Sequence, residues 1–377
     1  MSLIHILLFS LLNFIIGADS TKLEPVGADL LFVGDAMQHE GQLEQARLEG
    51  GGTSYDYKDC FPLLAPIVME ADYAVVNLEV PLGGGPTYRG YPCFSSPDSY
   101  AEALRDAGFD LFLTANNHCL DSGDKAARRT LDALDRIGVD HIGTYHNEAD
   151  RDTLVPFVKD INGIKIGFLN YTYGTNGIQP RDGMEVAYID KEKIRKEIAK
   201  TRKAGAEMIC VTMHWGIEYV LHENQEQRNL ADFLVGEGVD MVIGSHPHVI
   251  QPMKVVRNEK EKKDVLVVYS LGNLISNMKT TDTRGGALVK VRVEREPDGR
   301  PVFKNAAYDI FFAAKPQGRG TNYKVYPSAD ASKIPAGQQQ HWKMFERNAR
   351  KVFDECNVNV PAVTTAVARS QSVGVSN

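Results

Sequence analysis

The chain has 377 residues, of which 43% are hydrophobic and 24% charged, a composition typical of a globular protein with one large domain or two smaller ones. Its formal net charge of −7 argues against a general nucleic-acid binder, which is normally basic. The same charge disfavours binding of a polyanion over the whole surface, although local basic residues can still contact one.

The N-terminal residues differ from the rest of the chain. Residues 4–17 are almost wholly apolar, but this run is shorter than the about 20 residues that a membrane-spanning helix needs. Ala18-Asp19-Ser20 follows it, a small-x-small sequence suited to signal peptidase, although no basic segment precedes the apolar run. We therefore expect a signal peptide over residues 1–20 and an exported protein, periplasmic or at the cell surface. A buried first element and an uncleaved membrane anchor are the alternatives.

From residue 28 onward, short apolar runs alternate with longer amphipathic segments. The apolar runs predict strands at residues 30–33, 74–78, 111–114, 141–143, 164–170, 208–213, 241–244 and 266–270. The amphipathic segments predict helices at residues 62–70, 97–107, 124–137, 191–204 and 226–237. This alternation is typical of parallel βαβ units and predicts an α/β fold.

The pattern changes after Gly272. Residues 287–293 and 302–312 alternate apolar and polar side chains, as antiparallel strands do, and Glu296-Pro297-Asp298-Gly299 between them predicts a turn. The charged run 257–264 predicts a solvated hairpin loop. Residues 338–356 predict one amphipathic helix, with a loose tail after it. We expect one domain over residues 21–314 and a helical or irregular extension over residues 315–377.

The cysteines do not carry the chemistry of this chain. Cys60, Cys93, Cys119, Cys210 and Cys356 show no CxxC or other metal-type spacing. Cys210 lies inside a predicted strand and is expected to be an inert core thiol. One disulfide, such as Cys60–Cys93, is left open by the sequence.

The polar motifs lie at the C-terminal ends of predicted strands. In chain order they are Gly34-Asp35, Asn77-Leu78-Glu79, Asn116-Asn117-His118, His214-Trp215-Gly216 and His246-Pro247-His248. Ligands of open α/β sheets bind outside the carboxyl ends of the strands, so these side chains are expected to meet in one crevice. Each motif alone could be a turn, a helix cap or a solvated loop, but their shared position at strand exits favours one site.

The residue types of this set favour a metal centre. His246 and His248 flank Pro247, which stiffens the pair and is expected to hold His246 extended. Carboxylates, an amide and imidazoles suit one or two divalent ions of the Mn, Fe or Zn kind, since softer ions would call for thiolates. Two such ions can clamp the attacking and leaving oxygens of a hydrolysis. Without metal, converging carboxylates would repel one another.

The order of these motifs resembles that of the CapA family of capsule (poly-γ-glutamate) synthesis proteins, whose fold is similar to that of calcineurin-type metallophosphoesterases. The matching runs are Gly34-Asp35, Asn77-Leu78-Glu79, Ala115-Asn116-Asn117-His118, His214-Trp215-Gly216-Ile217-Glu218-Tyr219, Gly244-Ser245-His246-Pro247-His248 and Tyr269-Ser270-Leu271-Gly272-Asn273. The resemblance covers about residues 28–275. It implies a four-layer α/β sandwich with two mixed β-sheets flanked by helices. It also implies an exported protein of capsule biosynthesis with a metal-dependent hydrolase site.

The same resemblance implies two metal positions that share one carboxylate. The implied ligands are Asp35, Glu79 and His248 for one ion, and Glu79 as a bridge, Asn117, His214 and His246 for the other. Two departures from the phosphoesterase pattern weaken the first position: Met37 stands where that pattern has a histidine, and Glu79 replaces the bridging aspartate. A single ion bound by Glu79, Asn117, His214 and His246 is therefore the alternative.

The remaining roles also follow from the resemblance. His118 would be the catalytic general acid or transition-state stabiliser beside the leaving group. Residues implied to line the site or contact the substrate are Asn77, Asn116, Glu218 and Tyr219. Apart from the resemblance, the Gly-rich loops offer Arg89, Tyr88, Tyr91 and Arg181 as candidates for contact with the polymer, with ordinary surface residues as the alternative. The expected partners are the capsule polymer or its precursor and membrane-bound polymer synthesis or export proteins, and not nucleic acid. Two alternatives remain: a non-catalytic surface protein that binds or guides an anionic polymer, and a periplasmic phosphoesterase unrelated to capsule.

Overall fold

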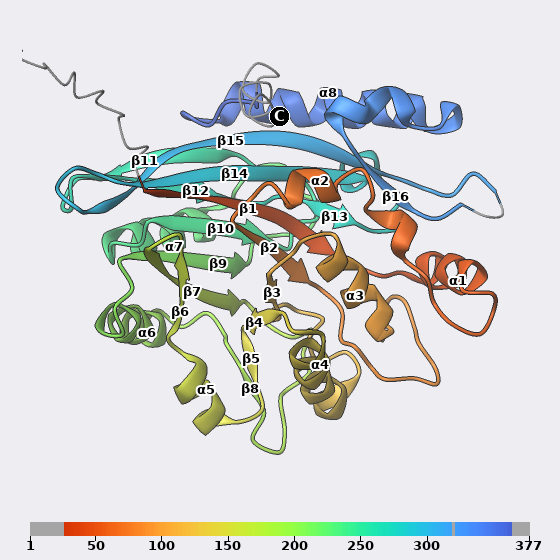
Figure 1. Ribbon diagram of the computed structural model, residues 1–377, viewed down its shortest axis with the longest axis horizontal. Helices are drawn as coiled ribbons and strands as arrows, with labels where there is room; N and C mark the ends of the chain where they lie inside the picture. The colour runs from red at the N-terminus through yellow and green to blue at the C-terminus, as the bar shows by residue number, and fades with distance from the viewer. Residues whose placement is uncertain (1–25, 319–320, 364–377) are drawn as a thin grey trace, which may run out of the picture.

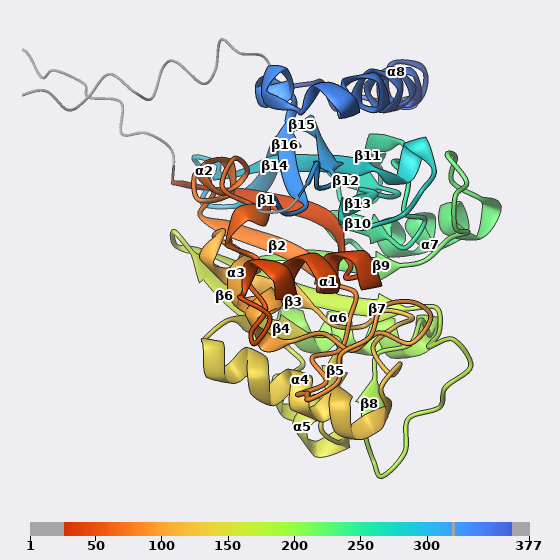
Figure 2. The same cartoon turned by 90° about the vertical axis from the view of Figure 1, so that its right-hand side faces the viewer.

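Two β-sheets face each other, and helices cover the outer side of each (Figures 1 and 2). The structure is a computed structural model that describes residues 26–318 and 321–363. The expected four-layer α/β arrangement with two mixed sheets is confirmed. The expected signal peptide over residues 1–20 lies outside the described residues. Within those residues, no helix has both the length and the apolar character needed to cross a membrane.

The first sheet combines a parallel half with an antiparallel half. Its strand order is β16 (Lys324–Pro327), β15 (Pro301–Ala314), β14 (Gly285–Arg295), β1 (Gly27–Ala36), β2 (Tyr73–Leu78), β3 (Leu111–Leu113) and β4 (Asp140–Ile142). Strands β1 to β4 run parallel, and β14 to β16 are antiparallel. The short β13 (Asn273–Ile275) pairs in parallel with the end of β1. The antiparallel pair expected after residue 272 is thus confirmed as β14 and β15.

The second sheet is parallel at its centre and antiparallel at both edges. Its order is β11 (Met253–Asn258), β12 (Lys263–Val268), β10 (Met241–Ser245), β9 (Met208–His214), β7 (Ile164–Thr172) and β6 (Phe157–Ile161). The charged run 257–264 forms the hairpin between β11 and β12, as expected. The edge strands β6 and β11 were not predicted, because they are only partly buried and lack a continuous apolar run. A separate small ladder joins β5 (Thr144–Tyr145) to β8 (Glu185–Val186).

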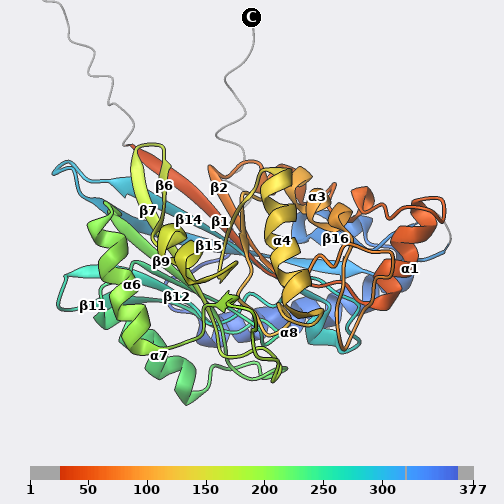
Figure 3. The same ribbon diagram turned by 90° about the horizontal axis from the view of Figure 1, so that it is seen from below.

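The helices form the two outer layers (Figure 3). Helices α3 (Asp98–Asp106) and α4 (Gly123–Ile137) pack on the outer face of the first sheet, and α6 (Lys191–Lys203) and α7 (Gln225–Gly236) pack on that of the second. The helix expected at residues 62–70 is shorter: only α2 (Ala65–Val68) forms there, after the 3₁₀ turn η1 (Lys58–Cys60). Helices α1 (Glu40–Glu49) and α5 (Glu148–Leu154) were not predicted.

The residues after 314 take part in the core. Strand β16 extends the first sheet, and three 3₁₀ turns, η2 (Thr281–Thr283), η3 (Ser328–Lys333) and η4 (Ala336–Gln338), lie near helix α8 (Gln339–Cys356). Trp342, Phe345 and Phe353 of α8 join the apolar cluster between the sheets. Beyond α8, single bridges pair Val358 with Lys254 of β11 and Ala362 with Tyr308 of β15. The last described segment therefore contacts both sheets.

The cysteines are free thiols throughout the described residues, so the disulfide left open between Cys60 and Cys93 is not formed. Cys210 is fully buried in the cluster between the sheets, as expected of a core thiol. Burial raises the pKa of its thiol, which keeps it protonated and unreactive.

Candidate metal centre

The alternation of side chains along two strands turns polar residues toward the space between the sheets. In β2, Tyr73 and Val75 belong to the cluster between the sheets, so Asn77 and, one step beyond the strand, Glu79 continue on that side. In β9, Met208 and Cys210 likewise belong to the cluster between the sheets, and the alternation along the strand places His214 on the same inner face. The carboxyl ends of both sheets therefore contribute side chains to one buried site.

A bulge in β1 brings Asp35 to the same side. Leu30 and Phe32 face the space between the sheets, and simple alternation would turn Asp35 toward the outer helices. The pairing with β2 shifts here: Phe32 lies opposite Val75, but Asp35 lies opposite Asn77, so β1 contains one additional residue. Such a bulge re-aims the next side chain. Gly34 permits it, since a Cβ at this position would lie 1.8 Å from the carbonyl oxygen of Gly272.

The turn after β10 has a conformation that we did not expect. His246 and His248 have φ values of +97° and +57°, so the prediction that Pro247 holds His246 extended is wrong. Positive φ in residues other than glycine costs about 1–3 kcal/mol and persists only where other contacts enforce it. Two hydrogen bonds from backbone amides hold this turn in place. The His246 amide donates to Asp35 Oδ2 at 3.2 Å, and the Tyr219 amide donates to the Pro247 carbonyl at 2.8 Å.

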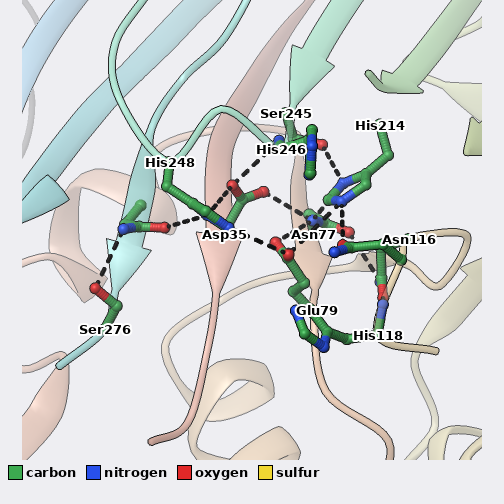
Figure 4. A network of polar contacts seen from close by, with 12 residues as sticks. Asp35, Asn77, Glu79, Asn116, His118, His214, Ser245, His246, His248 and Ser276 are labelled. Carbon is green, nitrogen blue, oxygen red and sulfur yellow. Dashed lines mark hydrogen bonds and ion pairs between the residues drawn. The ribbon is translucent and has the colours of Figure 1, made fainter. Parts of the chain in front are cut away.

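Glu79 lies at the centre of the cluster (Figure 4). Its Oε1 is 3.6 Å from His214 Nε2 and 3.7 Å from His248 Nε2, and all three side chains are buried. Asp35 Oδ2 lies 3.1 Å from His248 Nδ1. Asn77 Nδ2 donates to Asp35 Oδ1 at 2.8 Å and to Glu79 Oε2 at 3.3 Å, which fixes the two carboxylates relative to each other.

The structure brings together all six residues implied as metal ligands. Two groups of three have ligand atoms within 4.8 Å of one another, and both contain Glu79: one adds His246 and His248, the other Asp35 and His214. The remaining residue, Asn117, places its Oδ1 2.8 Å from His214 Nε2. A shared Glu79 agrees with the implied bridge. The histidines, however, are divided between the two groups differently from the division that the resemblance implies.

The charge states of the cluster fit a bound cation. Burial, and then the negative charge of Asp35, raise the pKa of the Glu79 carboxyl well above its usual range. Burial next to other histidines lowers the pKa of His214 well below its ordinary value and that of His246 to about 3. Both imidazoles are therefore neutral, as metal ligands must be. Among the described residues, Glu79 Oε1 and His246 Nδ1 are buried polar atoms without a hydrogen-bond partner. A divalent cation would satisfy both atoms.

His118 sits beside the ligand set with its ring held from several sides. Its Nδ1 is 2.7 Å from Asp121 Oδ2 and 3.3 Å from Asn176 Nδ2. The ring of Phe94 packs edge-on against it, with 4.7 Å between centroids. The Phe94 amide also donates to Asp121 Oδ2. Asp121 thus fixes the imidazole and keeps the proton on Nδ1, which leaves Nε2 for chemistry.

The other predicted residues lie in three different places. Asn77 and Asn116 are buried and connect the ligands: Asn116 Nδ2 donates to the Leu78 carbonyl at 2.9 Å and to Asn77 Oδ1 at 3.3 Å. Tyr219 is half exposed, with its ring centroid 6.3 Å from that of His248, and Glu218 next to it is partly buried. Arg89 lines a separate cavity.

Several residues of the site were not predicted from the sequence. Asp121 follows His118 by three positions, a spacing that could have signalled a pair. Asn273 is opposite Asp35 in the β13 pairing, and its Oδ1 lies 3.0 Å from His248 Nδ1; it stood in a recognised motif but received no role. No local pattern marks Tyr173, whose ring packs 4.5 Å from that of His246 and is half exposed.

His39, next to this region, should make the stability of the chain depend on pH. Burial lowers the pKa of its imidazole from 6.5 to about 4, so the folded state disfavours the protonated form. Its contribution to the free energy of unfolding is complete above pH 6.5 and is lost as the pH falls toward 4, by about 3 kcal/mol at most.

The variant His39→Gln tests this. We expect its free energy of unfolding, measured in urea between pH 7 and 4, to fall less steeply than that of the wild type. Loss of the ring contact with Phe94 lowers stability at every pH, so the slope and not the absolute value is the readout. The neutral histidines of the cluster titrate in both proteins. Equal slopes would contradict the prediction.

Comparison with known proteins identifies the family. The model of the bacterial capsule synthesis protein PGA_cap matches residues 29–278, which include the whole ligand set. The chain belongs to this family. The CapA resemblance that the motifs carried is thereby confirmed.

Two CapA proteins are relatives of this PGA_cap family member. The "PGA biosynthesis protein CapA" of Bacillus subtilis strain 168 is 27% identical over 291 residues, covering 75% of this chain and 73% of that protein. The "Capsule biosynthesis protein CapA" of Bacillus anthracis is 28% identical over 271 residues, covering 69% of this chain and 62% of that protein.

Solved structures with a related arrangement of the chain are more distant. The NAD nucleotidase of Haemophilus influenzae aligns with a TM-score of 0.46 at 10% identity, covering 87% of this PGA_cap family chain and 61% of that one. The calcineurin-like phosphoesterase YfkN of Bacillus subtilis aligns with a TM-score of 0.43 at 13% identity, covering 87% of this chain and 100% of that one.

Proposed function

We propose that this capsule synthesis family member is an exported, metal-dependent hydrolase that acts on the capsule polymer or its precursor. The bond cleaved would be a γ-glutamyl amide or a phosphate ester linked to the polymer. One observation carries the proposal: four potential ligands from two sheets, Asp35, His214, His246 and His248, converge on Glu79, whose Oε1 is buried without a partner among the described residues. The names of the CapA relatives support the assignment to a poly-γ-glutamate capsule. Membrane-bound synthesis or export proteins are the proposed partners.

The ligand set assigns the residues that would hold one or two divalent ions. Glu79 would contact both, with Asp35, His214, His246 and His248 as the other ligands that the two groups supply. A divalent ion there would act as a Lewis acid and lower the pKa of water at the site. The mixture of nitrogen and oxygen donors suits Mn, Fe or Zn.

The protein's own groups supply the remaining chemistry. In its imidazolium form, with Nδ1 donating to Asp121, His118 carries a second proton on Nε2, which it passes to the leaving group or uses to stabilise that group's charge. Asn77 keeps the two carboxylates apart at fixed positions, so the ligand set is formed before anything binds. Tyr173 and Tyr219 flank the histidines on the solvent side and offer ring surfaces to a substrate.

The test measures metal and activity together. Purified full-length protein is analysed for metal content as isolated and after incubation with Mn²⁺, Fe²⁺ or Zn²⁺. The loaded protein is then screened against phosphate esters and against γ-linked glutamate oligomers. We expect one or two bound ions and hydrolysis in one substrate class. If the protein binds no transition-metal ion, the proposed hydrolase activity is contradicted. If the metal-loaded protein binds the polymer without cleaving it, a role in guiding the polymer is favoured instead.

A further inference from the structure

A cavity beside the start of α4 has a different character from the metal centre. It encloses about 300 Å³ and is lined by Gly83, Thr87, Arg89, Ser95, Ser122, Lys125, Ala126 and Arg129. Every ionisable residue in this lining is a cation. The metal centre, in contrast, is built around two carboxylates. The cavity is therefore a local basic surface on a chain with a net negative charge.

One wall of the cavity is rigid. Arg129 donates two hydrogen bonds to Asp98, at 2.6 and 2.8 Å, and a third to the Leu82 carbonyl at 2.9 Å. The loop that contains Gly83, Gly84 and Gly85 packs closely against Arg129, since a Cβ at Gly84 would lie 2.1 Å from Arg129 Nε. Arg129 is thus a fixed part of the wall, and Asp98 already compensates its charge.

The charges available to a ligand belong to Arg89 and Lys125. Within the part of the chain that the structure describes, neither side chain forms an ion pair, and both are exposed at the cavity. Arg89 Nη2 lies 3.2 Å from the hydroxyl of Ser122, which directs the guanidinium across the cavity. Ser122 also precedes α4, so the positive end of this helix adds to the field that the two cations create.

The cavity and the metal centre are joined through one short segment. Ser122 Oγ donates to the Phe94 carbonyl at 2.6 Å, and the Phe94 amide donates to Asp121, the partner of His118. Ser95, the next residue, lines the cavity and pairs with Arg89 through two backbone hydrogen bonds. The Phe94–Ser95 segment therefore contacts both the lining of the cavity and Asp121, the partner of His118.

We propose that this cavity is an anion subsite that binds a carboxylate or phosphate group of a chain-like substrate, while a neighbouring unit of the same chain lies at the metal centre. The location of that neighbouring unit rests on the proposed function; the binding of the anion does not. Arg89 and Lys125 contact the anionic group, and Ser95 offers a hydroxyl donor. The subsite selects an anionic polymer over a small monoester, because a small ligand cannot occupy both places.

Binding without metal tests the subsite separately from the hydrolase. The probe is a short, fluorescein-labelled γ-linked glutamate oligomer, and its affinity for the full chain is measured by anisotropy in EDTA at low salt. Inorganic tripolyphosphate serves as the phosphate competitor. We expect Arg89→Gln/Lys125→Gln to weaken binding about tenfold or more, since both partners of the anion are charged donors. Added salt should reduce the difference between the two proteins.

A matched variant controls for loss of net charge. Lys343→Gln/Arg347→Gln removes the same two charges from α8, which lies on the opposite side of the molecule from α4 (Figure 1). This variant should bind like the wild type. If the glutamate oligomer does not bind but calorimetry detects binding of tripolyphosphate to the wild type, the subsite takes phosphate. The subsite is refuted if wild type binds neither probe, or if both double variants weaken binding equally; either result leaves metal content and hydrolysis to be judged independently.

Discussion

The variant His118→Ala is expected to lose hydrolysis by about 10²–10⁴-fold, the range typical for removal of a general acid. Metal content should remain that of the wild type, because His118 pairs with Asp121 and belongs to neither group of ligand atoms. The measurement is kcat on the substrate found in the screen, combined with metal analysis of the same preparation.

Asp121→Asn provides the companion to this variant. The amide can no longer hold the Nδ1 proton as a carboxylate does, so kcat should fall while the ring stays in place against Phe94. The alkaline limb of the pH–rate profile, where a general acid loses its proton, should also move. Full activity in His118→Ala would remove His118 from the mechanism, and loss of metal in that variant would place it among the ligands instead.

The variant Glu79→Gln is expected to change stability in opposite directions with and without metal. In EDTA it should unfold at the same temperature as the wild type or a higher one, because it removes a fully buried carboxylate whose pKa the fold raises. With Mn²⁺ at about 100 times its dissociation constant, the wild type gains about 2.7 kcal/mol by linkage. The variant should gain little, since Glu79 is common to both ligand groups.

Glu218→Gln is the matched control for this experiment. It removes a carboxylate of the same kind close to the site, from a residue outside both ligand groups. It should keep the metal-dependent rise in melting temperature. If Glu79→Gln is stabilised by Mn²⁺ as strongly as the wild type, the ion does not bind at this cluster.

Much of the site was predictable because it depends on simple alternation along strands. A polar residue at the end of an apolar strand, as in Val76-Asn77-Leu78-Glu79, continues the facing of the residues before it. Parallel strands bring such ends to one edge within each sheet, and Glu79 meets His214 because the corresponding edges of the two facing sheets lie together. The central strands of both sheets were predictable for the same reason, since burial on both faces leaves an uninterrupted apolar run.

The geometry that departs from simple alternation was not predictable. Asp35 reaches the site only through a bulge of one residue, which depends on the close approach of Gly34 to Gly272 from a distant part of the chain. The positive φ of His246 likewise depends on its amide hydrogen bond to Asp35. Both are tertiary effects, and the second overrides the local preference that Pro247 sets at His246.

Helix α8 determines when this chain can complete its fold. Trp342, Phe345 and Phe353 come late in the sequence but close the cluster that begins with Ala28 and Leu30. The contacts that bury the space between the sheets thus join opposite ends of the chain, and such long-range closure slows folding. A ribosome-bound chain that lacks these residues would leave apolar surface open between its sheets, where chaperones bind and aggregation starts. Its folding is accordingly an event that follows synthesis of almost the whole domain.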